Sequence, residues 1–290
     1  MMKKVLVLAT AVTVAAGSAC VSGCGQKELI GFDIDLAREV ARELGLKAEF
    51  KEIDWDVKET ELSTKAIDVV WNGFTYTEDR DNGYFDEDRN VQIGGLDFTN
   101  YYMKNKQVAV VKKSELGRYS ENASFAGKRG CAEATSAGES VIKETLGCSS
   151  AQLGKQLDVF TAVKAGTYDF GVVDLTMASE YVIAERGAYN DSLAVVELTG
   201  VEDEYYAVAF REGSDLVSVF NYTLAKLYQS GKAEEIAEEY ALGGALFNGF
   251  AQIDTENYTY PTGGDYEYVK NKGTVVIGYT VFAPMAYQKQ

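Results

Sequence analysis

The sequence contains no histidine, and only two of its 290 residues are proline and four are cysteine. Without histidine, the chain cannot build a Ser-His-Asp or Cys-His nucleophilic centre of the usual kind. The same absence excludes an HExxH zinc site and a Cys2His2 zinc finger. Several common kinds of hydrolytic and metal-dependent chemistry are therefore excluded.

Positive charge is also scarce, because 28 Lys and Arg stand against 44 Asp and Glu and give a formal net charge of −16. Nucleic-acid binding needs clustered Lys and Arg against the phosphates, so this balance argues against a nucleic-acid partner. With 46% hydrophobic and 25% charged residues, the composition is that of a globular chain. The length suits one large domain or two of roughly 100–150 residues each.

The apolar run at the start of the chain, Val5 to Ala16, has 12 residues. It is too short to cross about 30 Å of hydrocarbon as a helix, but after Lys3 and Lys4 it fits the core of a signal peptide. Residues 21–24, VSGC, resemble a bacterial lipoprotein box, in which the cysteine is lipidated after cleavage. We therefore expect residues 1–23 to be a lipoprotein signal peptide and Cys24 to carry the anchor. An ordinary secretory cleavage site is the alternative.

Cys131 and Cys148 would remain after such processing. An oxidising exterior permits a disulfide between them. Two buried free thiols are the equally open alternative.

Strand-like and helix-like segments alternate along the chain. Leu36, Val40 and Leu44 form an apolar helix stripe, which Asp33 or Asp35 can cap and Gly45 can end. Further helices are expected at about 57–65, 138–146, 175–186 and 214–240 (one helix or a pair), and strands at 46–50, 67–71, 108–111, 170–173, 205–210 and 274–278. This alternation predicts an α/β fold with mainly parallel sheets. Residues 243–264, rich in Gly, Asn and Thr, are typical of an exposed linker.

Three segments place polar groups at the start of a predicted helix. In the first, Thr75 and Glu78 have capping-box spacing, and Arg80 lies one turn on. Arginine offers a planar fork to a carboxylate. A capped helix with a solvated arginine explains the same pattern.

The second and third segments have similar alternatives. Ser136 and Glu139 again have capping-box spacing, at a helix start that can favour an anion or serve as a cap alone. Asp174 ends a buried strand and opens a helix. It can cap that helix, or hold an ammonium group beyond the carboxyl end of the strand.

Taken together, these segments resemble the two-lobed, polar-amino-acid family of bacterial extracellular solute-binding proteins, which serve amino-acid ABC transporters. The resemblance covers nearly all of 27–242 and 265–290. It rests on GFDIDLAREVARELG (31–45), AIDVVWNGFTYTEDR (66–80), QVAVV (107–111), TSAGES (135–140), VVDLTMA (172–178), EYYAVAFREGSDL (204–216) and VIGYTVFAPMAY (276–287).

The resemblance implies a ligand site made by residues of both lobes. Gly73, Thr75 and Arg80 would hold the ammonium and carboxylate of an amino acid, and Ser136 would complete the carboxylate site. Asp174 would bind the α-ammonium, and Phe282 would pack on the ligand. The resemblance implies no cofactor, no metal and no catalysis. It implies a monomer that delivers a polar amino acid to a membrane permease from the outer face of the cell membrane or the periplasm.

The order of the segments departs from that of the family. The segment that resembles 265–290 normally precedes the one that resembles 27–45, and here it follows at the chain's end. We therefore interpret the chain as a circular permutant, with 243–264 joining the family's usual termini. Permutation is tolerated where termini are close and the cut loop is exposed, so Lys27 and Gln290 should be neighbours.

The same interpretation predicts the lobes and their hinge. Lobe one would combine 27–106, 207–242 and 265–290, and lobe two would be 107–206. Two extended segments, 107–111 and 204–210, would form the hinge about which the lobes close on a ligand.

Two other functions use the same fold, since fold does not determine function. One is an enzyme similar to cyclohexadienyl dehydratase, and the other is a ligand-sensing domain.

The sequence does not determine which ligand side chain the cleft prefers. Asp54, Trp55, Asp56, Trp71 and Tyr102 can line the cleft, where acidic groups would favour a basic or polar ligand, or can be solvated and core residues.

Overall fold

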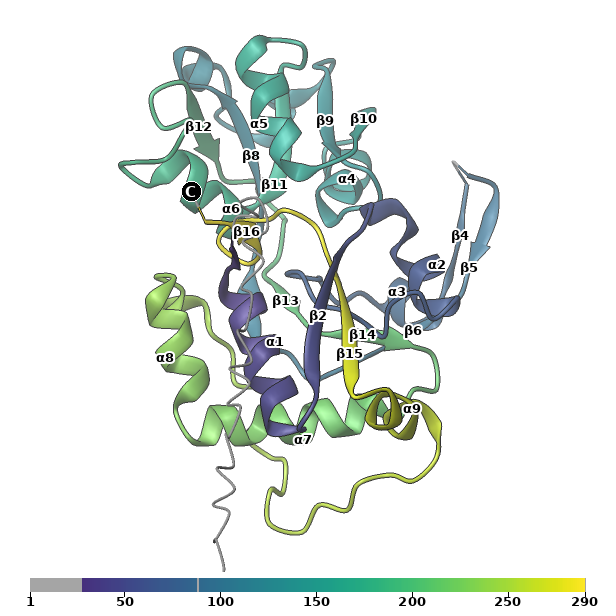
Figure 1. The fold of residues 1–290 in the computed structure, drawn as a ribbon. Helices are drawn as coiled ribbons and strands as arrows, with labels where there is room; N and C mark the ends of the chain where they lie inside the picture. The colour runs from purple at the N-terminus through teal and green to yellow at the C-terminus, as the bar shows by residue number, and fades with distance from the viewer. Residues whose placement is uncertain (1–27, 88, 290) are drawn as a thin grey trace, which may run out of the picture.

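The computed structural model describes residues 28–87 and 89–289. Two five-stranded sheets, each with its own helices, form two lobes (Figure 1). The predicted two-lobed α/β fold is therefore confirmed. The predicted signal peptide and Cys24 lie outside the described residues. Within residues 28–87 and 89–289, no helix has the length and apolar character that a membrane crossing requires.

The first sheet has the order β2-β15-β3-β14-β6. Its second strand, β15, comes from the end of the chain and runs parallel to both β2 and β3, and Ile277 is level with Phe50 and Val69. The strands are β2 (Lys47–Glu52), β15 (Thr274–Tyr279), β3 (Val69–Val70), β14 (Ala209–Arg211) and β6 (Leu96–Phe98). The helices of this lobe are α1 (Phe32–Glu43), α2 (Lys58–Ser63), α3 (Glu78–Asn82), α7 (Leu216–Gln229), α8 (Lys232–Glu239) and α9 (Gly264–Lys272).

The second sheet has the order β10-β9-β11-β8-β12. Its strands are β10 (Ser150–Leu153), β9 (Gly130–Glu133), β11 (Phe170–Asp174), β8 (Gln107–Lys112) and β12 (Leu193–Val196), and its helices are α4 (Ala137–Ser140), α5 (Gln156–Ala165) and α6 (Leu175–Ala178). In both sheets two neighbouring pairs are parallel and two are antiparallel. The sheets are more mixed than predicted because β8 and β14 enter from the other lobe, without a helical crossover on their own sheet.

The chain passes between the lobes at β7 (Met103–Asn105) and β13 (Glu204–Tyr206), which pair antiparallel. The crossing lies just before the predicted 107–111, because that segment already belongs to β8. The other predicted segment, 204–210, contains β13 and the start of β14. The lobe boundaries at 106 and 206 stay a prediction, and the strands of each sheet agree with them.

Helix α1 has the predicted apolar stripe, since Leu36, Val40 and Leu44 are buried. Its start differs from the prediction, because the N-cap position is Gly31 and no side chain caps the helix. A Cβ at Gly31 would lie 2.2 Å from the Met285 carbonyl oxygen, so this close approach requires glycine. Asp33 is therefore free to bond elsewhere: its Oδ2 accepts from Gly73 N at 2.6 Å and from the Tyr102 hydroxyl at 3.0 Å.

The predicted helix over 214–240 is a pair, because the left-handed Gly231 separates α7 from α8. The remaining elements are η1 (Trp55–Val57), η2 (Lys113–Arg118), η3 (Asn122–Phe125), η4 (Val141–Thr145), η5 (Ser179–Ile183), η6 (Gly243–Ala245), β1 (Leu29–Ile30), β4 (Tyr84–Asp86), β5 (Val91–Ile93) and β16 (Tyr287–Gln288). The helix predicted over 138–146 is α4 followed directly by the π-helix η4, and the one over 57–65 is the short turn η1 followed by α2. The one over 175–186 is α6 followed by η5, which ends three residues early.

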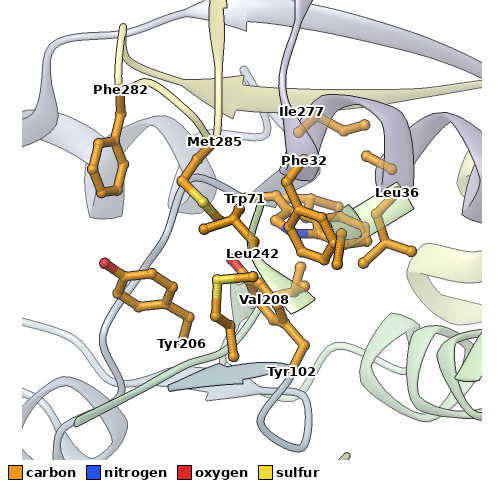
Figure 2. Packing of buried hydrophobic residues seen from close by; sticks show 14 of the residues in the cluster. Phe32, Leu36, Trp71, Tyr102, Tyr206, Val208, Leu242, Ile277, Phe282 and Met285 are labelled. Carbon is orange, nitrogen blue, oxygen red and sulfur yellow. The ribbon is translucent and has the colours of Figure 1, made fainter. Parts of the chain in front are cut away.

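An aromatic cluster stabilises the end of β3, where the polar segment begins. Trp71 is fully buried, with ring centroids 6.1 Å from both Tyr102 and Phe220. Figure 2 shows Trp71, Phe32 and Tyr102 grouped together, and Tyr206 and Phe282 at one edge of the cluster. Trp71 and Tyr102 are thus core residues, the second of the two alternatives that the sequence left open.

Residues 243–264 are mostly exposed, as predicted, but part of the segment packs on lobe one. Phe250 is fully buried, and the backbone N–H groups of Phe247 and Gly249 donate to Tyr102 and Tyr101 carbonyls. Aromatic residues embedded in the Gly- and Asn-rich segment supply the apolar area for this packing.

The two ends of the described chain meet. Strands β1 and β16 pair antiparallel, and Lys289 N donates to the Glu28 carbonyl at 2.8 Å. Lys27 and Gln290, which the prediction named, lie outside the described residues.

Candidate functional site

A cavity lies between the lobes, and all six of the predicted ligand residues line it. Lobe one supplies the segment after β3, lobe two supplies the ends of β9 and β11, and the segment after β15 supplies Phe282. The lining residues are Trp55, Asn72, Gly73, Thr75, Arg80, Glu133, Ser136, Ala137, Gln156, Asp174, Thr280 and Phe282.

Arg80 is buried and is held in place by backbone carbonyls. Its Nη1 donates to the Thr75 carbonyl at 2.6 Å and its Nη2 to the Thr135 carbonyl at 3.1 Å. The guanidinium lies 4.8 Å from the centre of the Phe74 ring, a cation–π contact. No ion pair of Arg80 occurs within 28–87 and 89–289. Burial lowers its pKa, so an anion in the cavity would stabilise it.

Helix α3 does not begin at Thr75, as the spacing predicted. Thr77 is the N-cap, and its side-chain oxygen accepts from Arg80 N at 3.2 Å. Thr75 instead remains extended and forms an isolated bridge with Tyr206. Thr75 therefore pairs with Tyr206, at the end of the crossing strand β13. In this position Thr75 lines the cavity.

Gly73 and Phe282 contact each other closely. A Cβ at Gly73 would lie 2.4 Å from Phe282 Cε1, and the φ of Gly73 is +57°. The N–H of Gly73 is already bonded to Asp33, so any contribution of Gly73 to a ligand comes from its carbonyl. Phe282 also lies edge-on to Tyr206 with ring centroids 6.4 Å apart (Figure 2).

Ser136 caps α4 as predicted, since its Oγ accepts from Glu139 N at 3.2 Å. In a capping box the Glu139 side chain would accept from the N–H of Ser136 itself. Here Glu139 Oε2 accepts instead from the N–H of the preceding residue, Thr135, at 2.7 Å. Thr135 has a φ of +59°, which turns its carbonyl and side chain toward lobe one. The bonds of Thr135 to Arg80 and Lys58 follow from this turn.

Asp174 occupies an N-cap position but makes no capping bond, so the cap, one of its two predicted roles, is not what the structure shows. Its Oδ1 accepts from Asn105, Gln107 and Tyr206 at 2.5, 2.9 and 2.8 Å. Its Oδ2 accepts from Gln156 Nε2 at 2.6 Å. Burial raises its pKa, and these donors oppose the rise.

A second carboxylate shares the same amide donors. Glu204 Oε1 accepts from Asn105 Nδ2 at 2.5 Å and from Gln107 Nε2 at 2.7 Å. Burial and the nearby Asp174 raise the pKa of Glu204 to about 7. Two carboxylates and two amides therefore form one network beside the cavity, with Asn105 and Glu204 on the crossing strands, Gln107 on β8 and Asp174 on β11.

Glu133, at the end of β9, faces the cavity from lobe two. It is only 5% exposed, and its Oε1 is buried without a hydrogen-bond partner. Burial, together with Asp174, raises its pKa to about 8, while Lys58 and the Gln156 backbone N–H oppose the rise. An unpaired carboxyl in such a place needs an explanation.

Lys58 is fully buried at the edge of the cavity. Its Nζ donates to the Trp55 carbonyl and to Thr135 Oγ1, both at 3.1 Å, and pairs with Glu59 at 3.2 Å. Burial lowers its pKa to about 8. Its partners thus take all three donors of the ammonium group.

Several cavity residues were not foreseen from the sequence. Glu133, Gln156 and Asn72 lie at the ends of elements and carry no motif, although Asn105 and Gln107 alternate on one side of the crossing strand in a way that could have been noticed. Trp55 lines the cavity, as one of its alternatives predicted. Asp54 and Asp56 line an adjoining groove, where Asp54 is exposed to solvent.

Cys131 and Cys148 are free thiols, so the disulfide, one of two predicted alternatives, is absent from this structure. Their Sγ atoms donate to backbone carbonyls of Phe170 and Phe125. Burial raises the pKa of Cys131 to about 12, which is typical of an inert core thiol.

Clusters of three or more side chains suited to a metal ion are absent from the part of the chain that the structure describes.

Comparisons with known proteins agree with this architecture. The family model of the bacterial extracellular solute-binding proteins, family 3, matches residues 22–243. The arginine-binding extracellular protein ArtP of Bacillus subtilis is 24% identical over 74% of this chain and 79% of its own. The L-cystine-binding protein TcyA of the same species is 27% identical over 73% of each.

Solved structures with similar sequences share the fold. An ABC uptake transporter substrate-binding protein from Streptococcus pneumoniae with bound histidine is 31% identical, with a TM-score of 0.61, over 72% of this chain and 82% of its own. An ancestral arginine-binding protein bound to arginine is 29% identical, with a TM-score of 0.62, over 73% and 88%.

Proposed function

The chain belongs to family 3 of the bacterial extracellular solute-binding proteins, and we propose that it captures a free amino acid between its lobes for an ABC permease. One observation carries the choice of ligand. The cavity has a buried guanidinium on one wall, at Arg80, and a buried carboxylate on the other, at Asp174. An α-amino acid has complementary charges at its carboxylate and ammonium groups.

In this proposal the ligand carboxylate binds Arg80, Thr75 and Ser136. Arg80 Nη1 and Nη2 are already oriented by backbone carbonyls, so little side-chain entropy is lost on binding. The ammonium group binds Asp174 and the Gly73 carbonyl, and Phe282 packs on the ligand's carbon atoms. Micromolar affinity corresponds to about −8 kcal/mol, which two desolvated charged pairs and aromatic packing can supply.

Closure of the lobes would complete the site, because its two charged groups lie on different lobes. Away from the crossing strands, contacts between the lobes include Lys58 to Thr135, Arg80 to Thr135, and Lys155 to Glu52 at 2.6 Å. They support a closed arrangement that a ligand would stabilise.

A thermal-shift screen of the twenty amino acids and cystine, followed by calorimetry, tests the proposal. At least one amino acid should raise the melting temperature, and Arg80→Ala should lose measurable binding to it. Arg118→Ala is the control, because Arg118 is an exposed arginine of the other lobe. Near-normal affinity of the Arg80→Ala variant would reject the assignment of Arg80.

We propose binding without catalysis. The family and the relatives described above are binding proteins, although one similar solved structure is an ancestral amino acid-binding protein called a precursor of cyclohexadienyl dehydratase. Incubation with prephenate-like acids tests this point directly, since turnover that Asp174→Asn abolishes would establish an enzyme.

We also propose that the chain is a circular permutant, with lobes as predicted from the sequence. Two observations support this. The family model ends at residue 243, yet β15 lies inside the first sheet, between β2 and β3. The β1–β16 pairing brings the two ends together. A rearranged gene, in which 243–290 precede 27–242, keeps the buried Phe250 and should yield a folded protein with unchanged ligand affinity; an insoluble product would argue against the permutation.

Anchoring through Cys24 is a separate proposal that rests on residues 1–24. Expression in bacteria with radiolabelled palmitate should label the wild type, and Cys24→Ser should remain unlabelled and unprocessed. Labelling of the variant would disprove the anchor.

Co-purification with a membrane permease tests the transport role against a sensing role.

A further inference from the structure

The strongest unexplained feature of the cavity is the carboxyl of Glu133. It is only 5% exposed, it lines the cavity, and its Oε1 has no hydrogen-bond partner. Buried polar groups are nearly always paired, and an unpaired one costs free energy. A ligand in the cavity would supply the missing partner.

The charges around the cavity indicate which partner is missing. Its lining holds one guanidinium, Arg80, and two carboxylates, Asp174 and Glu133. The α-carboxylate of an amino acid neutralises Arg80 and its α-ammonium neutralises Asp174. Glu133 then remains as the one carboxylate of the lining that the ligand's α-groups leave unmatched.

Lys58 is the one cation among the groups that act on Glu133, and its effect on the Glu133 pKa is smaller than that of burial and that of Asp174. The ammonium of Lys58 is bonded to Trp55, Thr135 and Glu59. The other charged groups that act on Glu133 are Asp174 and Asp158, which are negative, and the Gln156 N–H donates to it. Burial raises the pKa of Glu133 to about 8, so in the empty cavity the group holds a proton near neutral pH that a ligand cation would replace.

The space beyond Glu133 has the same character. Trp55 lines both the cavity and an adjoining groove, whose other lining residues are Asp54, Asp56, Ala134, Gln152, Leu153 and Gly154. Two of these are acidic and none is basic. A long side chain that leaves the cavity past Trp55 would enter an acidic environment.

We propose that the ligand is an amino acid with a positively charged side chain, and that Glu133 is the residue that recognises this charge. The inference rests on the proposed function, since it assumes that Arg80 and Asp174 hold the α-groups. The inference goes beyond the proposed function by naming the class of the ligand and the residue that selects this class.

Calorimetry with two matched ligand pairs tests the inference. L-Arginine and L-citrulline have nearly the same shape but differ in side-chain charge, and L-lysine and L-norleucine form a second pair. The wild type should prefer the charged member of at least one pair by about tenfold or more, the usual range for a hydrogen bond to a charged group. Glu133→Gln should remove most of that preference while still binding the neutral ligand, which also reports that the variant is folded.

Glu185→Gln is the control, because Glu185 is an exposed residue and the substitution makes the same chemical change. This control should keep the wild-type preference. Equal affinity of the wild type for both members of both pairs would overturn the inference, as would a Glu133→Gln variant with the full preference. The proposed function would survive both results, whereas a wild type that binds none of the twenty amino acids would reject the proposed function itself.

Discussion

The two walls of the cavity are built in different ways. On the lobe-one wall, the site is oriented mainly through backbone groups: the carbonyls of Thr75 and, from lobe two, Thr135 hold Arg80, and the Gly73 N–H donates to Asp33. On the lobe-two wall, side chains do this, since four side-chain donors surround Asp174. The first wall has aromatic faces and one cation, and the second has carboxylates and amides. A wall that is oriented by backbone groups keeps its geometry when side chains outside its own segment are substituted. A side-chain network loses its geometry when any one of its members is substituted.

The largest effect is expected from Asp174→Asn, which breaks the second wall. An asparagine carries no charge for the ligand ammonium and presents two donors to a network that needs an acceptor. Ligand affinity should fall by about 100-fold or more, the usual cost of removing one partner of a buried charged pair. Calorimetry measures this, with Asp191→Asn as an exposed control in the same lobe. A loss below about threefold would show that Asp174 does not hold the ligand ammonium.

Gly73→Ala perturbs the first wall and should have the next largest effect. The new Cβ would meet Phe282 at 2.4 Å and adopt a positive φ. We expect a loss of about 1–2 kcal/mol in the free energy of unfolding from the backbone alone, and a further loss in ligand affinity as Phe282 moves.

Gly45→Ala separates the two causes, because Gly45 also has a positive φ, +67°, but no atom lies within 4 Å of the place that its Cβ would occupy. This variant should lose stability in denaturant titrations and keep its ligand affinity. Equal ligand affinity of both variants would show that the contact of Gly73 with Phe282 is irrelevant to binding.

Asp33 provides a pH test of the first wall. Burial raises its pKa from 3.8 to about 7, so the folded state binds its proton more tightly than the unfolded state. The contribution of Asp33 to stability is therefore complete below about pH 4 and is lost as the pH rises through about 7. Wild-type stability should fall between about pH 5 and 8, and Asp33→Asn should have a shallower fall. Parallel pH profiles of the two proteins, measured by urea unfolding, would contradict this.

The smallest effect is expected at the rim where the walls meet. Lys155 and Glu52 pair across the lobes at 2.6 Å, but both side chains are about 40% exposed. An exposed pair contributes about 0–1 kcal/mol, so Lys155→Ala should change ligand affinity by less than about fivefold. A larger loss in calorimetry would mean that rim contacts, and not the buried walls, control closure.

The two walls also differ in how far the sequence predicted them. The family resemblance assigned Thr75, Arg80, Ser136 and Asp174 to the ligand site, and they line the cavity. The local patterns alone left helix capping open as an alternative, although motifs at strand and helix ends do face the same edge of a sheet. The second wall's network was not foreseen. Asn105, Gln107 and Glu204 meet only because β7 and β13 pair between residues about 100 positions apart, and local patterns do not contain that register.

Local patterns also misled in places where a tertiary contact prevailed. Asp33 could cap α1, but it bonds to Gly73 and Tyr102 from a buried position. Residues 243–264 have the composition of a linker, but Phe250 packs into the core. In both cases burial outweighs a weak local preference.

The central claim is that Arg80 and Asp174, on opposite walls, hold the two α-groups of one amino acid. The most direct test is calorimetry of the wild type with the tightest-binding amino acid and two analogues, one without the α-carboxylate and one without the α-ammonium. Both analogues should bind about 100-fold or more weakly, because each leaves one buried charge unpaired. If either analogue binds as tightly as the parent amino acid, the two walls do not share one zwitterion and the account is wrong.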